Sequence, residues 1–326
     1  MDSPARSRSI HTNFVFALVV LVLSYQFAQV RFAANQFYGF ATPEMLAAGT
    51  AWLPFQFRPL VPWLAGWLGS LPLRSGPSIL GWYKVIELVS TVALCYATRH
   101  YLSLFIPDDR LTALWTGALF YVLPFNLTFT FWYPWDVPSL LFFTLGLILL
   151  YRRDWKWYYP LFALATLNRE TTALLTLVYL ATTVGRAPRR QWLGHAALQA
   201  ALWLALRLLL FALYGRNPRL GYGLFELQLF NNLAWLLQPG IVLALLRNWG
   251  LIWVPVVLWP RFVSDPFVHR ALLIVPLMMF GLGFVGVVHE LRIYSEAVPL
   301  LLPALALVVQ GLYQSRRGAP PSESLP

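Results

Sequence analysis

The chain has 326 residues, of which 59% are hydrophobic and 11% are charged, and its mean hydropathy is +0.61. These values exclude an ordinary soluble domain and predict an all-α polytopic integral membrane protein. The formal net charge of +11 comes from basic residues in short loops between apolar stretches. That pattern follows the positive-inside rule, so no nucleic-acid partner is expected. A single cysteine excludes an intrachain disulfide.

Apolar runs divide the chain into about ten predicted transmembrane helices. A long loop, residues 31–78, separates the first two, and its prolines restrict it to short helical pieces at the membrane interface. The predicted spans are about 13–30, 79–98, 111–129, 137–151, two half-spans on either side of residues 168–171, 195–214, 248–259, 271–287 and 297–313, with 230–247 lying in the interface or re-entering the membrane.

The membrane region is predicted to be one domain, residues 13–313. Residues 1–12 form a cytoplasmic N-terminus before it, and residues 314–326 form a Pro/Ser-rich, disordered cytoplasmic tail. Ten spans place both termini on one side, where roughly fourteen Lys and Arg residues lie against roughly eight opposite. The terminal side is therefore expected to be cytoplasmic, and the location a bacterial plasma (inner) membrane.

A polar interruption, Asn168-Arg169-Glu170-Thr171, divides an apolar stretch that extends from about 160 to 184. In one continuous helix each central charge would cost roughly 2.5–3.5 kcal/mol. In a hairpin of two short helices the four residues lie at a turn on one membrane face, and the distribution of Lys and Arg favours this arrangement. Because short membrane helices need protein or water at their ends, the turn is expected to line a cavity.

Sorting the loops by side places a set of polar and charged residues, drawn from separate loops, on the external face. The cytoplasmic loops are short and basic and carry no comparable set, so the external face is predicted to be the working face, with these residues in one cleft. The set is Glu44, Arg58, Asp136, Asn168, Arg169, Glu170, Glu226, His289, Glu290, Arg292 and Glu296.

Several of these residues have a purely structural alternative. Asp136 precedes Val137-Pro138, which fits a helix N-cap as well as a catalytic or metal-binding carboxylate. Glu44 follows Thr42-Pro43, a sequence typical of a helix start, and is either a solvated first-turn residue or a catalytic acid. Arg58 is either an interfacial arginine with its head group in water or a phosphate ligand.

The remaining charges are open to the same two interpretations. Arg169 either pairs with Glu170 across the hairpin turn or binds a phosphate through its planar guanidinium group. The cluster between His289 and Glu296 is either a salt-bridged turn or part of a site. Lys84 and Glu87 stand three residues apart in a predicted span and are expected to form a neutralised pair.

The sequence contains no P-loop, no GxGxxG, no HExxH and no Cys/His zinc spacing. An ATP-driven or nicotinamide-dependent enzyme is therefore disfavoured.

Over about residues 10–313 this arrangement resembles the GT-C superfamily of polytopic glycosyltransferases. The resemblance is carried by the long external first loop with Glu44, by the external acid Asp136, and by the broken pair of spans around Leu164-Ala-Thr-Leu-Asn-Arg-Glu-Thr-Thr-Ala-Leu174. It implies a GT-C-like fold that transfers a sugar from a polyprenyl-phosphate donor to an acceptor hydroxyl at the external membrane face. The partners it implies are a lipid-linked sugar donor and membrane lipid.

The resemblance also implies roles for the external residues. Glu44, or failing that Asp136, would be the general base, and a divalent metal on Asp136 is a candidate cofactor. The phosphate-binding cation of the family maps to Arg169 or Arg292. Arg58, bracketed by Phe55 and Phe57, is a further candidate for the donor phosphate, and the supporting residues would be Asn168, Glu170, His289, Glu290 and Glu296. The alternatives from other classes are a transporter or flippase of an amphipathic lipid-linked substrate and a non-catalytic assembly subunit.

Overall fold

The computed structural model describes residues 4–72, 76–220 and 227–316, and in these ranges it confirms the all-α class. Two two-residue strands, β1 (Gln36–Phe37) and β2 (Phe131–Trp132), accompany the helices. The α-helices are α1 (Pro4–Ala34), α2 (Pro43–Ala48), α3 (Leu60–Gly69), α4 (Ile79–Ser103), α5 (Asp109–Gly117), α6 (Leu119–Leu127), α7 (Asp136–Arg152), α8 (Trp155–Asn168), α9 (Ala173–Thr183), α10 (Arg189–Tyr214), α11 (Leu229–Leu236), α12 (Pro239–Arg247), α13 (Trp253–Leu258), α14 (Pro266–Ala271), α15 (Ile274–Val285) and α16 (Val298–Arg316). Short 3-10 helices are η1 (Phe55–Phe57), η2 (Glu170–Thr172), η3 (Asn248–Leu251), η4 (Pro260–Phe262) and η5 (Leu291–Ala297).

Within the described residues, five helical segments are long and apolar enough to cross a membrane, which agrees with an integral membrane protein. A sixth is gained if the pair Leu229–Leu236 and Pro239–Leu251, bent by 96°, counts as one span. The other predicted spans fall on shorter helices. The five segments are Thr12–Ala34, Ile79–Ser103, Arg189–Tyr214, Pro266–Val285 and Leu291–Arg316.

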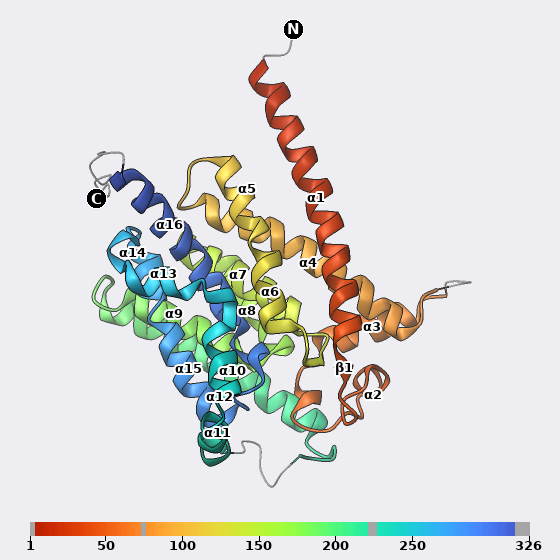
Figure 1. Ribbon diagram of the computed structural model, residues 1–326. Coiled ribbons are helices and arrows are strands. Elements are labelled where there is room, and N and C mark those ends of the chain that lie inside the picture. The colour runs from red at the N-terminus through yellow and green to blue at the C-terminus, as the bar shows by residue number, and fades with distance from the viewer. Residues whose placement is uncertain (1–3, 73–75, 221–226, 317–326) are drawn as a thin grey trace.

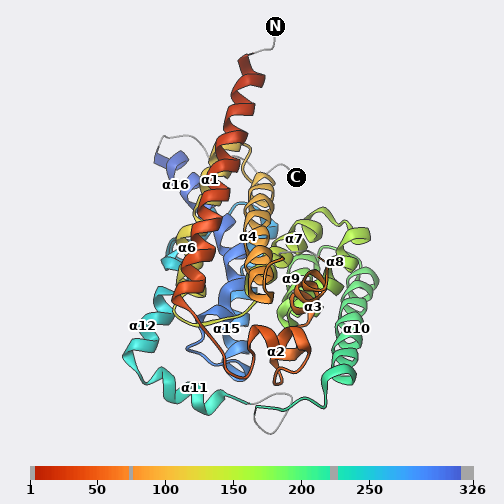
Figure 2. The ribbon, with the colours of Figure 1, turned by 90° about the vertical axis from the view of Figure 1, so that its right-hand side faces the viewer.

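Helices α7 and α16 form the centre of the bundle, and the other helices surround them. Side chains of α7 are buried along nearly its whole length, and α16 is buried from Val298 to Val308. Both helices are apolar on all sides, as a helix in the interior must be. Helix α1 stands at the edge, with its N-terminal part projecting beyond the bundle (Figures 1 and 2).

The two ends of the bundle differ in what they contain. The N-terminal part of α1, helix α5 and the C-terminal part of α16 lie at one end, and β1, α2 and α11 lie at the other (Figures 1 and 2). At that second end β1 pairs in parallel with β2, with Gln36 opposite Phe131 and Phe37 opposite Trp132. This pairing ties the chain after α1 to the segment that leads into α7. The region 38–72 consists of short helices, as its prolines predict.

The ends of the membrane region differ from the prediction. Helix α1 extends from Pro4 to Ala34 instead of from about 13 to 30, because its last turns pack on the bundle through Phe27, Ala28 and Arg31. Helix α16 continues to Arg316, so the predicted tail begins later than 314, and its residues 317–326 lie outside the described residues.

The predicted pair of Lys84 and Glu87 is wrong. The Glu87 carboxylate is buried and lies 3.0 Å from Arg31 Nη1, and it accepts a hydrogen bond of 2.7 Å from Trp132 Nε1. Lys84 is exposed, with its ammonium 5.1 Å from the ring centre of Phe32. Three residues along a helix turn a side chain by roughly 60°, and here that angle separates the bundle interior from its surface.

Arg31 is expected to be essential for stability, because its loss leaves the buried Glu87 carboxylate without an ion-pair partner among the described residues and removes the hydrogen bond to Asp136. Arg31→Gln should destabilise the protein by about 3–5 kcal/mol, seen as a lower melting temperature of the purified protein in detergent. Lys84→Gln is the control, since it removes an exposed charge three residues from Glu87. Equal melting temperatures for the two variants would contradict the role of Arg31.

Candidate functional site

The candidate site begins with the segment Trp132-Tyr-Pro-Trp-Asp136, which joins β2 to α7. Trp135 precedes α7 and Asp136 is its first residue, so the prediction of Asp136 as the N-cap is wrong. Its carboxylate is fully buried and is directed toward arginines instead of toward the helix amides. Oδ2 accepts a hydrogen bond of 2.7 Å from Arg31 Nη2, and Oδ1 lies 3.6 Å from Arg292 Nη1 and 3.9 Å from Arg169 Nη1.

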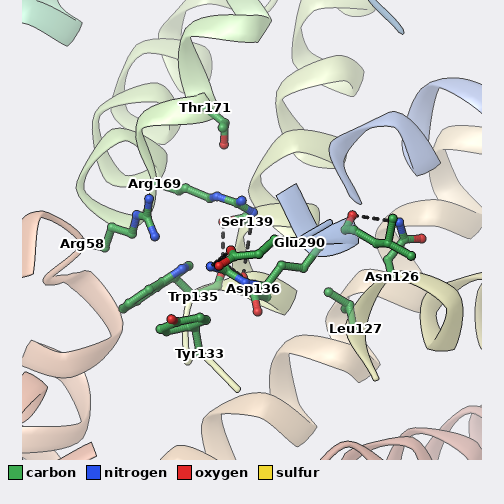
Figure 3. Close-up of polar contacts among 12 residues, drawn as sticks. Arg58, Asn126, Leu127, Tyr133, Trp135, Asp136, Ser139, Arg169, Thr171 and Glu290 are labelled. Carbon is green, nitrogen blue, oxygen red and sulfur yellow. Dashed lines mark hydrogen bonds and ion pairs between the residues drawn. The ribbon is translucent and has the colours of Figure 1, made fainter. Parts of the chain in front are cut away.

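Asp136 therefore lies at the middle of a buried set of charges, which we call the central ion network. Arg169 Nη1 also lies 3.1 Å from Glu296 Oε1, which accepts a hydrogen bond of 2.6 Å from the Thr171 hydroxyl. Figure 3 shows Asp136, Arg169 and Glu290 together in the middle of this region. The members of the network are Arg31, Glu87, Asp136, Arg169, Glu290, Arg292 and Glu296, with Arg292 joined to Glu290 at 2.6 Å.

The predicted hairpin is confirmed. Helix α8 ends at Asn168, Arg169 is extended at φ −161° and ψ 140°, and η2 leads into α9. Trp155 at the start of α8 and Tyr179 in α9 have ring centres 5.4 Å apart, so the two helices run back along each other. Asn168 Nδ2 donates to Ser139 Oγ at 2.8 Å and to the Trp135 carbonyl at 3.1 Å. These bonds fasten the turn to the start of α7.

The predicted pairing of Arg169 with Glu170 is wrong. Because Arg169 is extended, the two consecutive side chains diverge. The Glu170 carboxylate accepts hydrogen bonds from Nε and Nη2 of Arg58, the first at 2.9 Å, and lies 4.0 Å from Arg207 Nη1. Burial by itself would raise the pKa of Glu170, but the guanidinium of Arg58, helped by Arg207 and Arg169, holds it well below its ordinary value.

The aromatic residues before Asp136 present their ring faces to arginines. The guanidinium of Arg31 lies 5.9 Å from the ring centre of Trp132, and that of Arg58 lies 4.9 Å from Trp135. Arg292 lies 4.0 Å from the ring centre of Tyr133. Each contact is a cation–π interaction, which is strongest where water is excluded. One short segment thus supplies the central carboxylate, ring surfaces for two of its cations, Arg31 and Arg292, and a third ring surface for Arg58.

Two cavities of different size adjoin the central ion network. The smaller, about 10 Å³, lies against Arg169, Thr171 and Glu296, and has room for about one water molecule. The larger cavity has a volume of about 840 Å³, and we call it the open cavity. It is lined by Ala34, Gln36, Pro124, Phe125, Asn126, Thr128, Phe129, Thr130, Phe131, Ala244, Arg247, His289, Glu290 and Leu291.

Glu290 connects the open cavity to the network. Its Oε2 atom is bound by Arg292, and within the described part of the chain its Oε1 atom has no hydrogen-bond partner. Behind it, Asn126 Nδ2 donates to Asn248 Oδ1 at 2.5 Å and to the Leu291 carbonyl at 3.3 Å, which fixes the cavity wall (Figure 3). Arg247 and His289 are exposed on the cavity lining.

Most of the predicted site residues lie in or beside this region. Asp136, Arg169, Glu290, Arg292 and Glu296 are members of the network, Asn168 holds the hairpin turn, and Arg58 and Glu170 form the adjacent pair.

His289 and Glu44 lie outside the network. The ring centre of His289 is 4.5 Å from that of Trp235. Glu44 is exposed in the first turn of α2, which Thr42 caps by accepting a hydrogen bond from the amide of Met45 at 3.3 Å. The predicted helix start is confirmed. Glu226 lies outside the described residues.

Sequence analysis missed Arg31, Arg207 and Arg247. Arg31 was assigned to a loop, although Phe27, Ala28 and Arg31 recur at the spacing of one helix face. Arg207 lies inside a predicted span, and a charge there is itself a signal of a partner or a site. Arg247 gave no signal, because its place on the cavity depends on the bend between α11 and α12.

A metal ion does not fit Asp136. Its carboxylate faces the guanidinium groups of Arg31, Arg169 and Arg292, and their positive charge opposes a cation. Among the described residues no three His, Cys, Asp or Glu side chains are grouped to hold one.

Comparison with known proteins gives no match: no family model, no curated protein and no solved structure matches this chain. Function must therefore be inferred from the site.

Because Glu170 pairs with Arg58, the difference in stability between the parent protein and Glu170→Gln is expected to depend on pH. Because the folded-state pKa of Glu170 is depressed, its contribution is fully present above the unfolded pKa of about 4.3 and is lost as the pH falls below that value. Glu170→Gln should lower the melting temperature at pH 7, and the gap to the parent should narrow between pH 4 and pH 3.

Asp109→Asn is the matched control, since Asp109 pairs with Arg99 at 2.6 Å on the surface, with its side chain 63% exposed. Its effect at pH 7 should be small, because exposed pairs contribute about 0–1 kcal/mol. A Glu170→Gln gap that stays constant from pH 7 to pH 3 would show that the carboxylate charge is not what stabilises the fold.

Proposed function

We propose that the protein is a membrane glycosyltransferase that moves a sugar from a polyprenyl-phosphate donor to an acceptor hydroxyl in the open cavity. In this proposal the fold is GT-C-like with about ten spans, both termini are cytoplasmic, and the enzyme works at the external face of a bacterial plasma membrane. The observation that supports it best is a cavity of about 840 Å³ in which a carboxylate, a guanidinium and an imidazole meet aromatic walls.

The cavity has the size and character of a small-molecule site. Its volume falls in the range of about 300–1,000 Å³ that is usual for ligand pockets. Phe125, Phe129 and Phe131 provide apolar surface for an isoprenoid chain or a sugar face, and Phe129 is 89% exposed. The charged and titratable groups in the lining are Arg247, His289 and Glu290. Such a division suits a ligand with a lipid part and a charged head.

Glu290 is the general base in this mechanism. Its free Oε1 atom takes the proton of the acceptor hydroxyl while the hydroxyl oxygen attacks the anomeric carbon of the donor. The bond from that carbon to the phosphate oxygen breaks, and the bonding pair leaves with the polyprenyl phosphate. Arg292, which binds Oε2 and rests on the ring of Tyr133, holds the carboxylate in place. Glu44 and Asp136 are the alternative bases that the GT-C resemblance implies.

Arg247 is the group that receives the donor phosphate. Arg58, Arg169 and Arg292 are the phosphate ligands expected from the sequence, and each lies within 4.0 Å of a carboxylate that a phosphate would have to displace. Arg247 has no such ion pair within the described residues and is exposed on the cavity lining. His289, which lines the same cavity, adds a second donor to the leaving group.

The base assignment is tested with purified protein, a panel of polyprenyl-phosphate sugars and a lipid or sugar acceptor, with products measured by mass spectrometry. Glu290→Gln should lower turnover by about 10²–10⁴-fold and leave donor binding within a few-fold of the parent. If Glu290→Gln keeps parental turnover and Glu44→Gln or Asp136→Asn loses it, the base is the residue implied by the resemblance. Absence of turnover in the parent with every donor, together with movement of lipid-linked sugar across vesicles, would replace the enzyme with a transporter.

The phosphate assignment is tested by donor binding. Arg247→Ala should weaken binding of the donor by about tenfold or more, the value of one charge-assisted hydrogen bond, and Arg247→Lys should recover part of it. Arg261→Ala is the control, since Arg261 is exposed beside Phe262 and away from the cavity. Equal donor affinity in Arg247→Ala and the parent would reject the assignment.

A further inference from the structure

A second polar cavity lies at the far end of α7 from the candidate site. It encloses about 270 Å³ between the C-terminal ends of α7 and α9, the chain before α10 and the start of α14. Asp136 begins α7 and Arg153 follows its last residue, so at about 1.5 Å per residue the two ends are about 25 Å apart. Nothing in the proposed sugar transfer uses this cavity.

The lining of this cavity carries charges of both signs. Arg153 and Arg186 supply two guanidinium groups, and Asp265 supplies a carboxylate. One oxygen of Asp265, Oδ1, caps α14 by accepting from the amides of Phe267 at 2.8 Å and Val268 at 3.0 Å. Within the described part of the chain, Asp265 makes no ion pair with either arginine at 4 Å or less. The opposite charges thus share one cavity without neutralising each other.

The backbone conformation at Arg153 is one in which glycine would be expected, which suggests that the arginine side chain has a role. Arg153 is the C-cap of α7, with φ 56° and ψ 34°, in the left-handed region where helices most often place glycine. A large side chain in this left-handed conformation is less favourable than glycine would be. Arg186 follows Gly185, whose φ is 78°, and Arg270 Nη1 donates to the Val184 carbonyl at 3.1 Å. That bond ties the turn before Arg186 to α14, and so to Asp265.

The cavity also lies where a membrane surface would be. Candidate span Arg189–Tyr214 begins just after Arg186, and candidate span Pro266–Val285 begins just after Asp265. Aromatic side chains line its inner part, including Tyr151, Trp155 and Phe267, as is usual at the level of lipid head groups. Its volume is below that of a typical drug-sized pocket, and it fits a small polar head group.

We infer that this cavity binds the head group of a zwitterionic aminophospholipid, with the lipid phosphate on Arg153 and Arg186 and the ammonium group facing Asp265. An acidic lipid would satisfy the arginines but would leave the carboxylate without a partner. A head group with a phosphate and a primary ammonium complements all three side chains. The acyl chains would then lie along the apolar surface of the adjoining helices.

The test is native mass spectrometry of the full-length protein in detergent with phosphatidylethanolamine, phosphatidylglycerol and phosphatidylcholine of identical chains. The parent should retain phosphatidylethanolamine best. The double variant Arg153→Gln/Arg186→Gln should lose this retention by about tenfold or more, as expected for the loss of a charge-assisted contact. Asp265→Asn should lower the retention of phosphatidylethanolamine to that of phosphatidylglycerol. Helix α14 should stay capped in this variant, because Asn also caps helices well.

The control is Arg189→Gln/Arg190→Gln, which removes two exposed arginines from the same end of the bundle that do not line the cavity. Equal loss of lipid in this control would mean non-specific attraction and would overturn the proposal. So would parental retention in Arg153→Gln/Arg186→Gln, or equal retention of phosphatidylglycerol and phosphatidylethanolamine by the parent. Soluble phosphoethanolamine is tested as a competitor of the bound lipid. If it competes as well as whole phosphatidylethanolamine, the ligand is a soluble phosphate and not a membrane lipid.

Discussion

The structure depends on one buried carboxylate, Asp136, and the three arginines around it. An isolated charge in the interior of a membrane helix bundle is strongly unfavourable, and a buried ion pair is stable only when its geometry and hydrogen bonds are good. Here Arg31, Arg169 and Arg292 come from α1, the α8 end and η5, so the carboxylate joins three distant parts of the chain. Glu87, Glu290 and Glu296 then balance the arginines from their other sides. The bundle can close only if all of these partners arrive together.

The aromatic segment before Asp136 makes this arrangement specific. A guanidinium group can pair with a carboxylate in several ways, but stacking on a ring restricts its plane and position. Trp132, Tyr133 and Trp135 each take one arginine, and Trp132 also donates to Glu87. The hairpin turn adds a second restraint through Asn168, which bonds to α7. Polar residues in the membrane region thus define the geometry, while the apolar side chains contribute van der Waals packing between the helices.

The same network explains why Glu290 is the one member whose carboxylate lines the open cavity in the described part of the chain. Asp136, Glu87 and Glu296 are almost completely buried among arginines and aromatic rings. Glu290 is bound on one oxygen only and faces the open cavity with the other. A rigid, charged wall beside a cavity with apolar surface is suited to hold a charged head group while a lipid part remains outside. At the opposite end of α7 the wall of the second cavity is built differently, from loop arginines and a helix-capping carboxylate.

Four features could be predicted from the amino-acid sequence: the helical class, the short helices after α1, the broken hairpin at Asn168 to Thr171 and the grouping of Asp136, Arg169 and Arg292. These follow from hydropathy, proline positions and the sorting of charged loops, which are local properties. The sequence did not determine that Glu170 turns toward Arg58 while Arg169 turns toward Asp136, because this depends on one extended residue between two helices.

The partners of the buried charges depend on the tertiary structure and could not be predicted from the sequence. Glu87 finds Arg31 on another helix instead of Lys84 on its own, since the direction of each side chain depends on which face of α4 is covered. The place of Arg247 on the open cavity likewise follows from the bend of 96° between α11 and α12, which no local pattern encodes. Arg31 and Asp136 stand 105 positions apart in the chain, and Arg58 and Glu170 stand 112 positions apart. No local pattern in the sequence identifies such partners.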